Sequence, residues 1–235
     1  MALAMGLVTV WSFLVPDALG FQHPELARIF FWHFPCPILA SILLMFGGWF
    51  SFKYLTTKDR KWDVCAESAN ELGYLFCLLT MATGIIFSQV QWGTWWQSDP
   101  RQTSFLLVLL IYAAYFAIRA AYSDGERRAG VAAAYAMSAL GPAMFLIFVF
   151  PRLPQIASAS FHPTQSIMAG QIKGDYAIVV ILVLGLISVL AWWLFQLRIR
   201  AGLLELEGQQ NGLETYRRDS APTGVVRPIS LPRKN

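Results

Sequence analysis

Long stretches without a charged residue constrain the fold of this chain more than any other feature. Seven stretches of at least 16 residues contain no Asp, Glu, Lys or Arg: 1–16, 29–52, 72–98, 102–118, 129–151, 153–172 and 176–197. A membrane-spanning helix needs about 20 mostly apolar residues, and a charged side chain at the bilayer centre is costly. Only 14% of the residues are charged, whereas a soluble domain usually carries about 25%. The sequence therefore predicts a membrane protein.

Six of the seven stretches are predicted to cross the membrane. The stretch 153–172 contains Pro154 and Pro163 among many polar residues, and a backbone broken in this way would leave hydrogen bonds unmet in lipid, so a polar loop is expected there. The predicted fold is an all-α polytopic membrane protein with six transmembrane helices, near 1–16, 34–53, 70–89, 103–120, 130–150 and 177–197. Residues 1–207 would form the membrane domain, and residues 208–235 a flexible cytoplasmic tail.

The basic residues predict which ends of the spans face the cytoplasm. One set of connections, with the tail, holds 14 Lys and Arg residues, and the opposite set holds only Arg28, Arg101, Arg152 and Lys173. By the positive-inside rule, the set of 14 is cytoplasmic, and both termini then lie inside. This topology accounts for the isoelectric point of about 9.1, so we do not expect nucleic-acid binding.

All three histidines fall on the predicted external side. His33 opens the second span, and His162 lies in the last external loop, each in an apolar and aromatic setting. A lone histidine at such a place is usually a satisfied interfacial side chain. Neutral imidazole is also a common metal ligand, however, and a flat macrocycle needs one ligand on each side of its iron. His23 lies among polar residues and is expected to be solvated.

The second external loop, 91–103, is rich in tryptophan. Trp92, Trp95, Trp96 and Asp99 follow the i, i+3, i+4, i+7 pattern, so a helical segment would place them on one face as a platform for a planar ligand. The alternative for each tryptophan is the aromatic belt at the membrane surface. Asp99 before Pro100 is also typical of a helix N-cap with proline at N1.

Two external arginines are candidates for binding an anion. Arg101 follows the tryptophan-rich segment, where its guanidinium could pair with a carboxylate or simply anchor the fourth span. Arg28 lies five residues before His33, so one helical face cannot present both side chains. Cys36 is close to His33 in sequence, but as a lone cysteine between two prolines it is expected to pack in the core.

These residues form two motifs that resemble a known family. Trp-Gly-Thr-Trp-Trp-x-x-Asp-Pro-Arg-x-Thr at 92–103 resembles the WWD signature of haem-handling membrane proteins, and Arg-Ile-x-x-x-His-x-Pro at 28–35 is most similar to the CcmC (haem exporter protein C) family. The resemblance implies that His33 and His162 ligate haem iron and that Arg28 matches a family arginine. Ser98 stands where the family usually has tryptophan. The loop implied to lie against the haem contains Trp92, Gly93, Trp95, Trp96, Asp99 and Arg101.

The resemblance also implies a function in cytochrome c maturation. Haem b would be transient cargo, bound at the external face of the bacterial inner membrane and delivered to the haem chaperone CcmE, with CcmA, CcmB and CcmD as further partners. Binding and transfer are expected, with no catalytic residue. One alternative is an enzyme, either a CcsA-like cytochrome c synthase subunit or a membrane haem oxidoreductase. The other is a small-molecule permease, although the spans lack the charged pairs that commonly mark a solute path.

Overall fold

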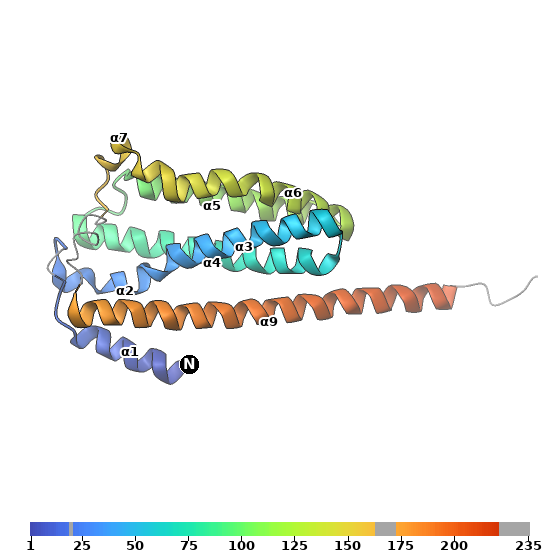
Figure 1. Ribbon diagram of the computed structural model, residues 1–235, viewed down its shortest axis with the longest axis horizontal. Coiled ribbons are helices and arrows are strands. Elements are labelled where there is room, and N and C mark those ends of the chain that lie inside the picture. Colours follow the sequence, from blue (N-terminus) through green and yellow to red (C-terminus); the bar gives the residue numbers. More distant parts are fainter. Residues whose placement is uncertain (19–20, 163–172, 221–235) are drawn as a thin grey trace, which may run out of the picture.

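The computed structural model describes residues 1–18, 21–162 and 173–220, with side chains as far as residue 212. Every regular element in these ranges is a helix, which confirms the all-α prediction (Figure 1). The elements in chain order are α1 (Ala2–Leu14), η1 (Pro24–Ile29), α2 (Phe30–His33), α3 (Pro35–Thr57), α4 (Arg60–Trp92), α5 (Pro100–Ala121), α6 (Gly125–Met144), the π-helix η2 (Phe145–Val149), η3 (Phe150–Arg152), α7 (Pro154–Ala157) and α9 (Gly174–Ser220).

Five helical segments of the described chain are long and apolar enough to cross a bilayer: Pro24–Thr57, Arg60–Trp92, Pro100–Ala121, Gly125–Arg152 and Gly174–Gly212. They contain the expected spans from the second to the sixth. The expected first span corresponds to α1, which has 13 residues and is about 20 Å long, against a hydrocarbon core of about 30 Å. The chain is therefore a polytopic helical membrane protein, and the count of six spans stays a prediction.

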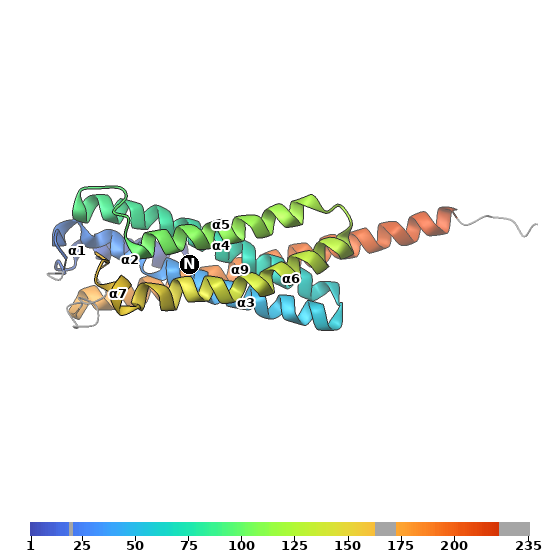
Figure 2. The ribbon, with the colours of Figure 1, turned by 90° about the horizontal axis from the view of Figure 1, so that it is seen from above.

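The connections sort to the two ends of the bundle as the charge pattern predicts. The α3–α4 and α5–α6 connections lie at the end from which α9 projects, and the α4–α5 loop, α7 and the segment after α1 lie at the other (Figures 1 and 2). The connections predicted to be cytoplasmic thus share one end. We refer to the opposite end, which carries the tryptophan-rich loop, as the external end.

Helix α4 begins well before the span predicted at 70–89. Asp59 caps its N-terminus by accepting a hydrogen bond from the backbone N–H of Lys61 at 3.0 Å. The charged residues of this first part remain helical because they pair with neighbouring helices, as Asp63 does with Arg119 of α5. The positions of charged residues therefore predict the limits of the apolar span, but they do not predict where the helix begins.

Close packing of α3 against α4 depends on a small residue. A Cβ placed on Gly47 would lie 1.9 Å from Oδ1 of the buried Asn70, so only glycine allows this approach. Small residues at helix interfaces are typical of membrane bundles. The core that results continues through α5, α6 and α9, and it holds the external ends of α3, α4 and α5 in fixed positions around the site.

The last helix is longer than predicted. Helix α9 has 47 residues and continues to Ser220, so the first part of the segment predicted as a tail from residue 208 is helical. Figure 1 shows α9 projecting beyond the ends of the other helices. Residues 221–235 of the predicted tail lie outside the described residues.

Candidate functional site

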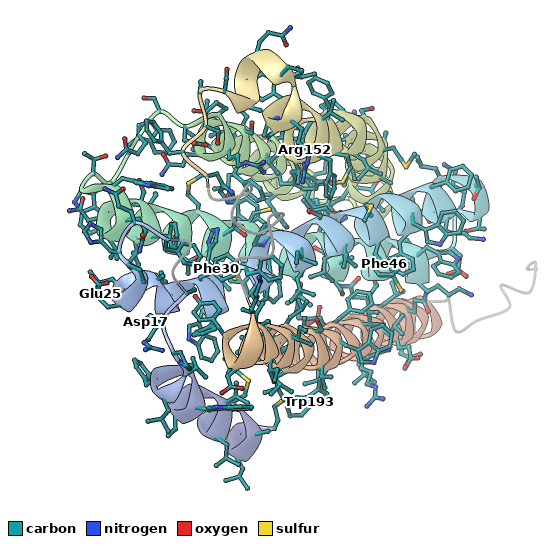
Figure 3. The ribbon with its side chains drawn as sticks, turned by 60° about the vertical axis from the view of Figure 1, so that its left-hand side comes forward. Asp17, Glu25, Phe30, Phe46, Arg152 and Trp193 are labelled. Carbon is teal, nitrogen blue, oxygen red and sulfur yellow. The ribbon has the colours of Figure 1, made fainter. Side chains whose placement is uncertain are left out.

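A cavity of about 400 Å³ lies at the external end of the bundle, within the range of about 300–1,000 Å³ that is usual for small-molecule sites. Its wall is mostly apolar, with side chains such as Ile38, Met81 and Phe105 from three different helices. Both His33 and His162 line it. Figure 3 looks towards this end, where the labelled Phe30 of α2 and Arg152 of η3 come from opposite sides. Two histidines 129 positions apart in sequence therefore meet at one cavity.

His33 is held in one orientation by two residues of α4. Its Nδ1 lies 2.8 Å from Oγ1 of Thr83, and the Thr83 hydroxyl donates its own proton to the carbonyl of Leu79 at 2.6 Å. The hydroxyl can therefore only accept from His33, which places the imidazole proton on Nδ1 and leaves Nε2 with a lone pair. A Cβ on Gly84 would lie 3.2 Å from Cε1 of His33, so glycine makes room for the ring.

His162 reaches the cavity from the segment after α7, and its imidazole is neutral. Burial lowers the pKa of His162 to about 3, and the positive charge of Arg101 lowers this pKa further. His33 and Arg152 also act on it, so these four side chains are close enough to interact. A neutral imidazole is the form that binds a metal ion. Both histidines thus line one cavity, and their ligation of iron stays a prediction.

Asp99 joins the His162 segment to α5. It caps the helix, as predicted, with Oδ1 accepting from the backbone N–H of Arg101 at 2.7 Å. The other oxygen, Oδ2, accepts from the Ser160 hydroxyl at 2.8 Å and from the backbone N–H of Phe161 at 2.6 Å. Asp99 is buried, and bonds of this kind to a charged group are worth about 1.5–3 kcal/mol each. A single carboxylate therefore fixes the backbone next to His162.

Asp99→Ala is expected to release this segment. Loss of the Oδ2 bonds should accelerate hydrogen exchange at the Phe161 amide by about 10- to 100-fold, while Asp99→Asn, which keeps one oxygen acceptor, should give a smaller change. Asp124→Ala is the matched control, because Asp124 caps α6 in the same way through the Glu126 N–H and lies far from residue 161 in the fold. Unchanged exchange at Phe161 in Asp99→Ala would show that other contacts hold the segment.

The helical platform considered for the tryptophan-rich loop does not form. Helix α4 ends at Trp92, since Gly93 adopts a φ of 76° and closes the helix with a left-handed cap. The following residues form a loop with Trp95 60% and Trp96 41% exposed. Of the four positions in the predicted platform, Trp92 and Asp99 line the cavity, and Trp95 and Trp96 lie outside its wall. Gly93 also lies outside the wall.

The two candidate arginines have different surroundings. Arg101 lines the cavity, and its Nε is buried without a hydrogen-bond partner in the part of the chain that the structure describes. Arg28 instead points to the end of α1. It donates to the carbonyls of Ser12 and Val15 at 2.6 and 3.1 Å and pairs with Asp17 at 2.8 Å. Arg28 thus holds α1 against the bundle and does not line the cavity.

His23 and Cys36 both lie outside the cavity wall. The side chain of His23 is about half exposed and lies 3.7 Å from Glu25. The buried Gln91 binds both backbone groups of His23, at 3.0 and 2.9 Å, and so fastens this segment to α4. Cys36 is buried and donates to the carbonyl of Trp32. The predictions of a solvated histidine and a packed cysteine agree with these positions.

Three residues of the site were missed by sequence reasoning. Thr83 and Gly84 lie inside an apolar stretch, where nothing distinguishes them from other small residues of a span. The sequence marked Arg152 only as one of four external basic residues, yet it lines the cavity together with Arg101. The pairing of Thr83 with the histidine 50 positions earlier could be found only by placing α2 beside α4.

The site does not resemble a metal centre built from protein ligands alone. No group of three or more His, Cys, Asp or Glu side chains suited to a metal ion occurs among the described residues. Two neutral imidazoles at an apolar cavity instead fit a metal whose remaining ligands come from a bound ring. An apolar wall, two imidazoles and nearby guanidinium groups together suit a flat amphipathic metal complex that carries acidic groups.

Comparison with known proteins identifies relatives of this chain. Residues 1–211 match the family described as Heme exporter protein C. Proteins named Heme exporter protein C from Paracoccus denitrificans and Bradyrhizobium diazoefficiens are 32% identical over 120 residues and 33% identical over 131 residues, covering 51% and 56% of this chain and 49% and 48% of theirs. The Escherichia coli K12 protein of that name is 28% identical over 53% of this chain and 50% of its own. The aligned part spans about half the length of these relatives.

Proposed function

Since the chain belongs to the heme exporter protein C family, we propose that it binds haem in the external cavity for delivery during cytochrome c maturation. The observation that carries this proposal is that His33 and His162 line one cavity. Haem b is cargo here, and the residues that bind it are those of a carrier. No catalytic residue is assigned.

The two imidazoles would act as ligands on opposite faces of the haem iron. His33 supports this role because its bond to Thr83 leaves Nε2 available, and His162 supports it because burial keeps its ring neutral. A hydrogen bond on the other ring nitrogen is the usual arrangement for a histidine that binds metal. His33 sits on a helix and His162 on a tethered loop, so release would begin on the His162 side.

The remaining site residues would hold the ring and its acidic groups. Trp92 and the apolar wall would contact the ring, Asp99 would position the His162 segment, and Arg101 would pair with a propionate. The loop through Gly93, Trp95 and Trp96 continues directly from Trp92, so we propose that it meets the part of the ring that projects from the cavity. Arg28 would support the site indirectly by holding α1.

The proposed location and partners follow from the family and the topology. The cavity would open on the periplasmic side of the bacterial inner membrane, because the opposite end carries most of the basic residues. The acceptor would be the haem chaperone CcmE, which could approach the exposed Trp95 and Trp96. CcmA, CcmB and CcmD would complete the assembly.

A cavity-filling variant tests whether this cavity is the haem site. Ile38→Trp places an indole in the cavity wall and is expected to lower haem uptake by purified protein at least about tenfold, as measured by absorbance titration. Met81→Trp, which places an indole in the wall from α4, should lower haem uptake in the same way. Ile86→Trp is the matched control, since Ile86 is an exposed isoleucine of α4 outside the cavity wall. Equal haem binding by all three folded variants would place the site elsewhere.

A further inference from the structure

Two guanidinium groups from separate elements line the cavity. Arg101 comes from the first turn of α5, and Arg152 is the last residue of η3. Both act electrostatically on His162, which lines the same cavity. The cavity wall is otherwise mostly apolar, so these two cations are its dominant charged feature.

No ion pair in the described ranges includes Arg101 or Arg152. Among the described residues of the wall, Asp99 is the only acidic side chain. Its two oxygens already accept bonds from Arg101 N–H, Ser160 and Phe161. A cation beside an apolar cavity costs free energy when no anion is near it. Such a cavity therefore favours a ligand that carries negative charge.

The local backbone holds Arg152 in place. The π-helix Phe145–Val149 follows the helix-interior Pro142. Nη1 of Arg152 donates to two carbonyls of this segment, to Ile147 at 3.2 Å and to Phe148 at 2.7 Å. The guanidinium also lies over the Phe148 ring at 5.9 Å. A guanidinium has five N–H donors in a planar fork. In Arg152, only the Nη1 group donates to described residues. The rest of the fork remains to bind an anion.

We propose that Arg152 and Arg101 bind the two carboxylates of the ligand, one each, and so select a flat ring with two acidic groups on one edge. The inference rests on the proposed function, in which those groups are the haem propionates. The apolar part of the ring would contact apolar residues of the wall such as Ile38 and Met45 of α3. Arg152 is exposed and Arg101 partly buried, so Arg101 contributes more to affinity and Arg152 more to orientation and selectivity.

Esterified haem separates this role from a general effect on the site. The full-length protein, purified in detergent without phospholipid, is titrated with haem and with haem dimethyl ester, which keeps iron and ring but lacks both carboxylates. Arg152→Gln is expected to weaken haem binding about 5- to 20-fold and to leave ester binding unchanged. Arg152→Lys, which keeps the charge without the fork, should fall between. Lys173→Gln removes an exposed charge near the same end and should change neither affinity.

The outcomes distinguish this inference from the proposed function. If Arg152→Gln weakens the ester and the free acid equally, Arg152 only supports the backbone of η2 and the inference is wrong. If it weakens haem binding only after anionic phospholipid is added, the arginine binds a lipid headgroup and the inference is also wrong. His33→Ala and His162→Ala report on iron ligation and should weaken both compounds alike. Their failure to do so would count against the proposed function, whatever Arg152 does.

Discussion

Replacement of both His33 and His162 by alanine is expected to abolish the visible spectrum of six-coordinate haem and to weaken haem binding on the order of a hundredfold or more. In the proposed site, each imidazole would supply one nitrogen ligand to the iron, and two such ligands would give a low-spin spectrum. Without them, the ring would be held only by its proposed contacts with the apolar wall and the two arginines. Absorbance spectra and titration of the purified protein measure both effects.

The two single variants should differ from each other. His33 is fixed by Thr83 and Gly84 of a long helix, whereas His162 depends on a loop held by Asp99. Loss of His162 should therefore leave haem bound through His33 as a five-coordinate complex, and added imidazole should restore the low-spin spectrum. Loss of His33 removes the better-ordered ligand and should lower affinity more.

His23→Ala is the matched control for these variants. His23 is the only other histidine of the chain, and it lies outside the cavity wall with an exposed side chain. Its loss should leave spectrum and affinity unchanged. A double variant with the native spectrum would show that other residues ligate the iron, and it would remove the basis of the proposed function.

The sequence predicted those parts of the protein that depend on local pattern. Charge-free stretches located the long helices because a charge in lipid is costly at every position. Asp99 before Pro100 predicted the start of α5 because a cap needs only an acceptor next to the first turn. The grouping of His33 with His162 followed from topology, since both lie at the same end of the bundle.

The geometry of the tryptophan-rich loop could not be predicted in this way. The i, i+3, i+4, i+7 spacing has meaning only within a continuous helix, and the positive φ of Gly93 ends α4 immediately after Trp92. Arg28 shows a second limit. Its partners are mainly the backbone carbonyls of Ser12 and Val15 at the end of α1. No side-chain motif encodes backbone contacts, so a motif could indicate an important arginine without indicating its contacts.

Arg119→Leu is expected to cause the largest loss of stability, about 3–5 kcal/mol, since it leaves a buried charge without its partner. Arg119 is buried at the inner end of α5 and binds Asp63 at 2.7 Å and Glu67 at 2.6 Å, both on α4. Without Arg119, the buried Asp63 retains only Arg60, at 3.6 Å. Unfolding of the purified protein in detergent, by heat or denaturant, measures the loss.

A double variant separates this cause from simple loss of packing. Arg119→Leu combined with Asp63→Leu removes both buried charges and should recover much of the lost stability, because the remaining Glu67 is partly exposed and can be hydrated. Arg198→Leu is the control, since its pair with Glu71 is largely exposed and should contribute no more than about 1 kcal/mol. If the double variant were as unstable as Arg119→Leu, packing of the Arg119 side chain against Tyr115 would account for the effect, and the unpaired carboxylate would not.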